Sequence, residues 1–91
     1  MRDRIVNVAT FTDPAREIAK LRDLYRSVGE ARAEMGEAPI AFDGFVQLVR
    51  DQVLTARKRG LPEVAFRVAL KDGKVAFTAR GLKGTSGGEK G

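Results

Sequence analysis

Few residues of this sequence could carry chemistry. Cys and His are both absent from its 91 residues, which excludes disulfides, thiol nucleophiles, Cys/His zinc sites and catalysis by an imidazole base. Any catalysis would fall to carboxylates, lysines, Tyr25 or a hydroxyl group. No two of these groups have the spacing of a catalytic pair, so we expect a protein that is not an enzyme, with no catalytic residue and no cofactor.

Three glutamates, Glu30, Glu34 and Glu37, lie close together in the sequence. Hard cations prefer oxygen ligands that converge from several structural elements, whereas these carboxylates follow one edge of a predicted helix. Glu30 and Glu34 also repel each other at the i,i+4 spacing. The pattern therefore indicates a solvated run of charge and not a metal site.

The glycines near the C-terminus do not form a phosphate-binding loop. Residues 82–91 are rich in glycine and nearly free of apolar side chains. They lack the Gly-x-x-x-x-Gly-Lys-Ser/Thr pattern, and no predicted helix follows them to direct its amide groups at a phosphate. This composition predicts a flexible tail instead.

Positive charge is concentrated in the second half of the sequence. Residues 1–42 contain seven basic and seven acidic side chains, whereas residues 43–91 contain ten basic and five acidic ones and so carry the whole formal net charge of +5. Such segregation in a small domain is typical of a polyanion-binding surface. We therefore predict contacts with nucleic-acid phosphates, with little sequence specificity. The predicted contact residues are Arg50, Arg57, Lys58, Arg59, Arg67, Lys71, Lys74 and Arg80.

Ordinary structural roles could account for the same cations. Arg57 and Arg59 end a predicted helix, where each positive charge interacts favourably with the helix dipole by about 0.3–1 kcal/mol. Lysines beside a hairpin turn and cations along a strand edge also suppress pairing between sheets. Recognition of bases by stacking is not expected, because Phe66 and Phe77 are predicted to face the core.

The elements that must position these cations begin with a β-hairpin. Apolar residues alternate with small or polar ones on both sides of Asp72-Gly73, a dipeptide typical of a two-residue type I′ turn. With this turn, Lys71 pairs with Lys74 and the apolar residues of both strands fall on one face. The other face then carries Arg67, Lys71, Lys74 and Arg80, with Ala65, Ala69 and Ala76 between them.

Two helices are predicted before the hairpin. The first covers residues 13–36 and begins at an Asp-Pro start signal, with Gly29 as a point where it could kink or break. The second covers residues 42–59. Its apolar residues fall within an arc of about 100°, the width of a core-facing stripe, which leaves Leu54 on the exposed side.

The whole pattern predicts a small α+β domain. Residues 4–12 are rich in β-branched side chains and predict a strand, which could join the hairpin or pair with another chain. The order β-α-α-β-β, with 43% hydrophobic and 32% charged residues, predicts two helices packed on an antiparallel sheet. We expect a single domain over residues 1–81, followed by the tail at 82–91.

Protein binding is the alternative to nucleic-acid binding. If the first helix uses its other apolar residues for its own core, Leu24 and Ala31 could contact a second copy of the chain or another protein. Leu54 is the third candidate for such a contact, and an exposed sheet edge could pair with a neighbour. A winged helix-turn-helix is a further alternative, which requires Gly29 to split the first helix.

No segment is predicted to cross a membrane or to direct export. A spanning helix needs about 20 mostly apolar residues, and the sequence has no such run. The N-terminal residues are too polar for the apolar core of a signal peptide. A small secreted domain usually relies on disulfides, so the lack of cysteine favours a cytoplasmic protein.

Overall fold

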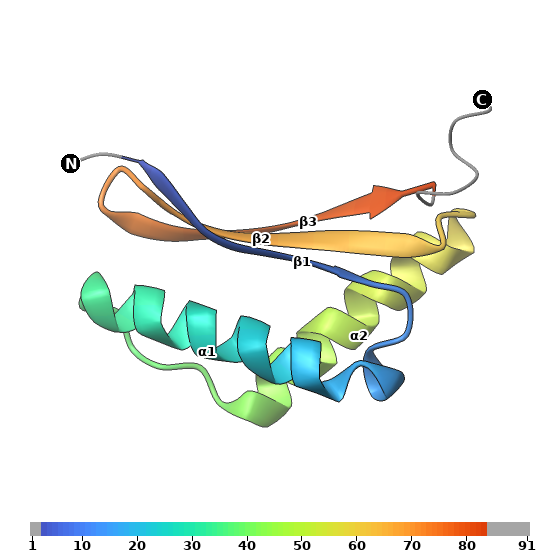
Figure 1. Cartoon of the computed structure of the whole chain (residues 1–91), viewed down its shortest axis with the longest axis horizontal. Coiled ribbons are helices and arrows are strands. Elements are labelled where there is room, and N and C mark those ends of the chain that lie inside the picture. The colour runs from blue at the N-terminus through green and yellow to red at the C-terminus, as the bar shows by residue number, and fades with distance from the viewer. Residues whose placement is uncertain (1–2, 84–91) are drawn as a thin grey trace.

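A three-stranded antiparallel sheet with two helices on one of its faces forms the fold (Figure 1). The computed structural model describes residues 3–83. Its elements are β1 (Arg4–Phe11), the 3₁₀ turn η1 (Pro14–Arg16), α1 (Ile18–Glu34), α2 (Phe42–Lys58), β2 (Glu63–Lys71) and β3 (Lys74–Leu82). The predicted order β-α-α-β-β and the α+β class are confirmed.

The central strand of the sheet is β2, which lies between β1 and β3. The first strand, whose partner the sequence left open, therefore pairs with β2 of the same chain. A β-bulge between Ile5 and Asn7 shifts the register of this pairing. β1 and β3 consequently form the two edges of the sheet.

The predicted hairpin is confirmed in both its turn and its register. Asp72 and Gly73 have φ angles of 53° and 76°, the left-handed values that a type I′ turn needs at both central residues. Lys71 lies opposite Lys74, and the register continues without a shift along both strands. The buried residues of β2 are Val64, Phe66, Val68 and Leu70.

The last strand extends slightly further than the sequence pattern predicts. β3 ends at Leu82, one residue beyond the predicted end of the domain at residue 81. Leu82 lies opposite Glu63, so pairing with β2 decides where the strand ends. Residues 84–91 of the predicted tail lie outside the described residues.

The first helical region begins at the predicted place but in two parts. Asp13 Oδ1 accepts a hydrogen bond from Ala15 N at 3.2 Å, and Pro14 starts the 3₁₀ turn. Glu17 then leaves helical geometry, with φ −116° and ψ 45°, and α1 starts at Ile18. The Glu17 carboxylate accepts hydrogen bonds from backbone N–H groups before the turn. These two hydrogen bonds tie the Glu17 side chain to the segment between β1 and the 3₁₀ turn.

α1 is continuous through Gly29. The break considered at this glycine is therefore not formed, and the winged helix-turn-helix alternative, which needs that break, is wrong. The tertiary contacts of α1 with the sheet outweigh the cost of one interior glycine, which is about 1 kcal/mol relative to alanine.

Both helices end at glycines, as predicted. Gly36 and Gly60 have φ angles of 73° and 81°, a conformation that glycine adopts without a steric cost. After each glycine, a backbone N–H donates to a carbonyl five residues earlier in the chain. This is the Schellman pattern that caps the free carbonyl groups of a helix.

The core lies between the helices and the sheet, and α1 contributes Leu24 and Ala31 to it. These side chains are 0% and 2% exposed, so the prediction that they contact a partner is wrong. They share one arc of α1 with Leu21 and Val28, and that arc packs against the sheet. Leu54 on α2 is 52% exposed, and its role as a partner contact stays a prediction.

Candidate functional site

The sheet face opposite the helices is termed the open face. Successive side chains of a strand point to opposite faces of the sheet, and the buried residues of β2 point to the helices. The residues that alternate with them therefore form the open face, together with their neighbours on β1 and β3. These residues are Ile5, Val8, Thr10, Glu63, Ala65, Arg67, Ala69, Lys71, Lys74, Ala76, Thr78, Arg80 and Leu82.

Four of the predicted contact residues lie on the open face, and all four are exposed. They are Arg67, Lys71, Lys74 and Arg80. Alanines lie between them, so no bulky side chain separates one cation from the next. Glu63 is the only acidic residue that the three strands place on this face. The open face is therefore a positively charged surface that a phosphate group can approach closely.

These four cations have no acidic partner among residues 3–83. The ion pairs found there are Arg4–Glu34, Arg16–Asp13, Lys20–Glu17 and Arg32–Glu37. All of these residues belong to the half of the chain whose charges balance. The charge of the described cations beyond residue 42 is consequently available to an external anion.

The predicted contact residues of α2 lie on the other side of the sheet (Figure 1). α2 packs on the helix-bearing face through Phe45, Val49 and Val53. The prediction that all eight cations form one surface is therefore wrong, because the sheet separates the two groups. The cations on the helix side are Arg50, Arg57, Lys58 and Arg59.

Two of the helix-side cations, Arg57 and Arg59, contact other parts of the chain. Arg57 Nη2 donates a hydrogen bond to the carbonyl oxygen of Thr12, which joins the end of α2 to the segment that follows β1. Arg59 is the C-cap residue of α2 and lines a cavity beside β3. Neither residue therefore belongs to the candidate phosphate site.

All six aromatic side chains of the sequence lie away from the open face. Phe66 stacks on Phe77 with ring centroids 5.6 Å apart, and Phe45 lies 5.6 Å from Phe77. Tyr25 contacts both Phe42 and Phe45 on the helix side, and Phe11 packs on Phe66. The open face thus offers no ring for a nucleic-acid base to stack on, in agreement with the predicted register.

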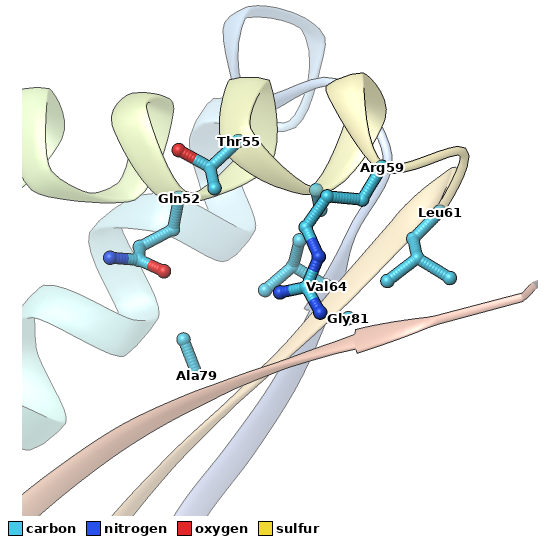
Figure 2. Close-up of a pocket in the computed structure, with 8 residues that line it drawn as sticks. Gln52, Thr55, Arg59, Leu61, Val64, Ala79 and Gly81 are labelled. Carbon is cyan, nitrogen blue, oxygen red and sulfur yellow. The ribbon is translucent and has the colours of Figure 1, made fainter.

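A small cavity opens between α2 and β3, and the sequence did not predict it (Figure 2). Its volume is about 90 Å³, and its walls include Gln52 of α2, Arg59 at the C-cap of α2, and Ala79 and Gly81 of β3. Figure 2 shows the Gln52 and Arg59 side chains extending from α2 toward β3. The small size of residues 79 and 81, on the helix-facing side of an edge strand, is the sequence signal for this space.

Neither a metal site nor the comparisons with known proteins give a further guide to function. Among residues 3–83, no group of Asp or Glu side chains is arranged to hold a metal ion. Neither helix in this range combines the length and apolar character needed to cross a membrane. No protein-family model matches the chain, and no curated protein or solved structure is significantly similar to it.

Proposed function

We propose that this domain is a non-enzymatic module that binds nucleic-acid phosphates through the open face, with little sequence specificity. The proposal is supported chiefly by the four exposed cations of this face, which have no ion pair among the described residues. Basic side chains bind a nucleic acid by displacing its condensed counterions, and this contribution is independent of base sequence.

The shape and composition of the open face agree with backbone contacts. Alanine and threonine side chains between the cations let a sugar-phosphate backbone approach the sheet, and several DNA-binding proteins place strands in a groove. The lack of aromatic rings on this face argues against recognition by base stacking. We also propose a cytoplasmic location, on the lack of cysteine in the sequence.

A paired comparison of charge-removing variants tests this proposal. The double variant Arg67→Gln/Arg80→Gln removes two open-face cations, and Arg50→Gln/Lys58→Gln removes the same charge from α2. Fluorescence anisotropy with duplex DNA or RNA over a range of salt concentrations measures the affinity and its salt dependence. We expect the open-face variant to reduce the slope of log K against log salt by about 0.9 for each lost contact.

The α2 variant serves as the matched control and should bind with nearly the wild-type slope. Equal weakening by both variants would point to a diffuse attraction between opposite net charges and would overturn the assignment to the open face. Lack of binding by the wild-type protein at about 50 mM salt, where phosphate contacts are strong, would overturn the proposed function itself.

Contact with a protein, including a second copy of the chain, is the second candidate function. Ile5 and Val8 favour it, because these apolar side chains are 59% and 54% exposed on the open face. Light scattering over a range of protein concentrations tests this candidate. A stable dimer that the Val8→Lys variant converts to a monomer would support it over phosphate binding.

A further inference from the structure

The outer edge of β3 and the adjoining cavity form a second surface, separate from the open face. We propose that this edge binds an extended acidic segment of a partner protein, which adds to the sheet as a fourth strand. The proposal goes beyond phosphate binding at the open face and does not depend on it.

Beyond Val75, the outward backbone groups of this edge are free to pair. Lys71 and Lys74 flank a two-residue turn and form a hydrogen-bonded pair, so every second residue of β3 directs its N–H and C=O away from β2. Val75 has this orientation, since its N–H donates to Glu37 Oε2 at 3.1 Å. The next residues with outward groups are Phe77, Ala79 and Gly81. No loop or side chain among residues 3–83 forms a hydrogen bond with these outward groups.

β1, the other edge, is less suitable for an added strand. The bulge between Ile5 and Asn7 distorts it, and bulges of this kind protect edges from pairing. Thr12, just after β1, has both backbone groups occupied, because its N–H donates to Glu17 and its carbonyl accepts from Arg57. β3 keeps an unshifted register along its whole length, so β3 is the more regular of the two edges.

The cavity can accommodate one of the side chains that the added strand directs toward the helices. Directly opposed residues of neighbouring strands project on the same face of a sheet, so the residue opposite Ala79 projects toward the helices. There the side chains of Gln52 and Arg59 extend from α2 into the space of about 90 Å³ (Figure 2). A carboxylate at this position can accept hydrogen bonds from the Arg59 guanidinium.

Charge along the edge selects an acidic segment. The residues next to the one opposite Ala79 project on the open face, beside Thr78 and Arg80. Arg59 and Arg80 therefore flank the edge from its two sides, and neither has an ion pair among the described residues. Two consecutive acidic residues would place one carboxylate near each arginine.

A second copy of this chain fits the same edge less well. Antiparallel pairing of two β3 strands would bring the basic residues of one copy, Lys74 and Arg80, near the basic residues of the second copy. Like charges that face each other across strands are destabilising. The edge is thus suited to a strand of opposite charge and not to self-pairing.

A titration with synthetic peptides tests the proposal. The probe is a short capped peptide in which a central Asp-Glu pair is flanked by alternating Val and Thr. The control peptide carries Asn-Gln at the same two positions. Backbone amide chemical shifts of the domain report the site, and we expect changes at Phe77, Ala79 and Gly81 with the acidic peptide only. Arg59→Gln should weaken binding about fivefold, the effect of one exposed charge contact.

A proline variant separates this site from the phosphate site. The Ala79 N–H points away from β2, and proline is tolerated on an edge strand at such a position. Ala79→Pro should therefore abolish peptide binding while circular dichroism and nucleic-acid binding stay unchanged. The matched variant Arg67→Gln, on the central strand, should weaken nucleic-acid binding and leave peptide binding unchanged.

Several results would overturn the proposal. Equal binding of the Asn-Gln peptide, chemical shift changes away from β3, or wild-type affinity in a folded Ala79→Pro protein would each do so. Concentration-dependent protection of the β3 amides from hydrogen exchange without peptide would show that a second copy occupies the edge. If Ala79→Pro fails to fold, the comparison of the two peptides on the wild-type protein decides the matter.

Discussion

Among single residues, Glu17 joins the first strand to the helical layer. Its Oε1 accepts hydrogen bonds from Thr12 N and Asp13 N, both at 2.9 Å, and its Oε2 accepts one from Lys20 Nζ at 3.0 Å. Partial burial alone would raise the pKa of this carboxyl, but the hydrogen bonds and the Lys20 charge outweigh it and lower the pKa. Glu17 therefore supports the fold in its ionised form.

The lowered pKa of Glu17 predicts a pH-dependent contribution to stability. At pH 7, Glu17→Gln should reduce the free energy of unfolding by about 1 kcal/mol, because it removes charge-assisted hydrogen bonds. This stabilisation is fully present above the ordinary pKa of 4.5 and is lost as the pH falls through the lower pKa of the folded protein. Urea denaturation of both proteins, from neutral to acidic pH, measures the difference.

Glu30→Gln is the matched control for this prediction. Glu30 is exposed and forms no ion pair within residues 3–83, so its replacement should change stability little at any pH. A Glu17→Gln effect of the same size at pH 7 and well below pH 4.5 would contradict a role for the carboxylate charge.

Single residues on α1 also show where sequence reasoning fails. The sequence leaves Leu24 and Ala31 free for a partner only if Ile18, Leu21 and Tyr25 fill the core, whereas the structure buries both beside Leu21. Periodicity shows that a helix is amphipathic, but two overlapping apolar stripes do not reveal which one faces the sheet. α2 has one narrow apolar stripe, and four of its residues, Phe45, Val49, Val53 and Ala56, are buried, whereas Phe42 and Val46 at its margin are half-buried.

At the scale of elements, Gly29 lowers the stability of α1, and no close packing requires a glycine at this position. A Cβ added at Gly29 would have no neighbouring atom within 4 Å, and the residue has ordinary helical geometry. Gly29→Ala should therefore raise the free energy of unfolding by about 0.5–1 kcal/mol, because alanine loses less backbone entropy on folding. Denaturant titration of the variant and the wild-type protein measures this change.

Gly36→Ala provides the contrasting control at the end of the same helix. The space around Gly36 is equally open, but residues other than glycine rarely adopt its backbone φ angle of 73°. This variant should lower stability while Gly29→Ala raises it. A destabilised Gly29→Ala protein would mean that α1 is not a regular helix at this position.

The sequence predicts elements better than it predicts their arrangement. Turn chemistry and alternation are local properties, so the hairpin at Asp72 could be predicted to its exact register. The pairing of β1 and the side of the sheet that α2 covers depend on contacts between residues distant in sequence. The sequence pattern therefore groups Arg59 and Arg67 in one patch, although the sheet lies between them, and does not predict the cavity beside Ala79.

For the molecule as a whole, charge is divided between neutralised and unneutralised regions. Three of the four ion pairs among residues 3–83 tie α1 to the segments around it, Arg4–Glu34 and Arg32–Glu37 among them. The hairpin, by contrast, places Lys71 directly opposite Lys74 on the open face. Like charges in this position destabilise a sheet, so the pair is unfavourable for folding and favourable for binding an anion.

This conflict predicts that one substitution will raise stability and weaken binding together. Lys74→Glu converts the repulsive pair into an attractive one and should raise the free energy of unfolding by about 0.5 kcal/mol at low salt. Thermal or urea denaturation measures the gain. It should nearly vanish at about 1 M salt, where exposed charges are screened within about 3 Å.

The double variant Lys71→Glu/Lys74→Glu identifies the source of the effect. It restores two like charges at the same positions, so the gain in stability should disappear, whereas two independent effects would add. Both variants should bind duplex nucleic acid more weakly than the wild-type protein, the double variant most of all. A Lys74→Glu protein that is more stable and binds as tightly as wild type would mean that the lysine pair does not contact phosphate.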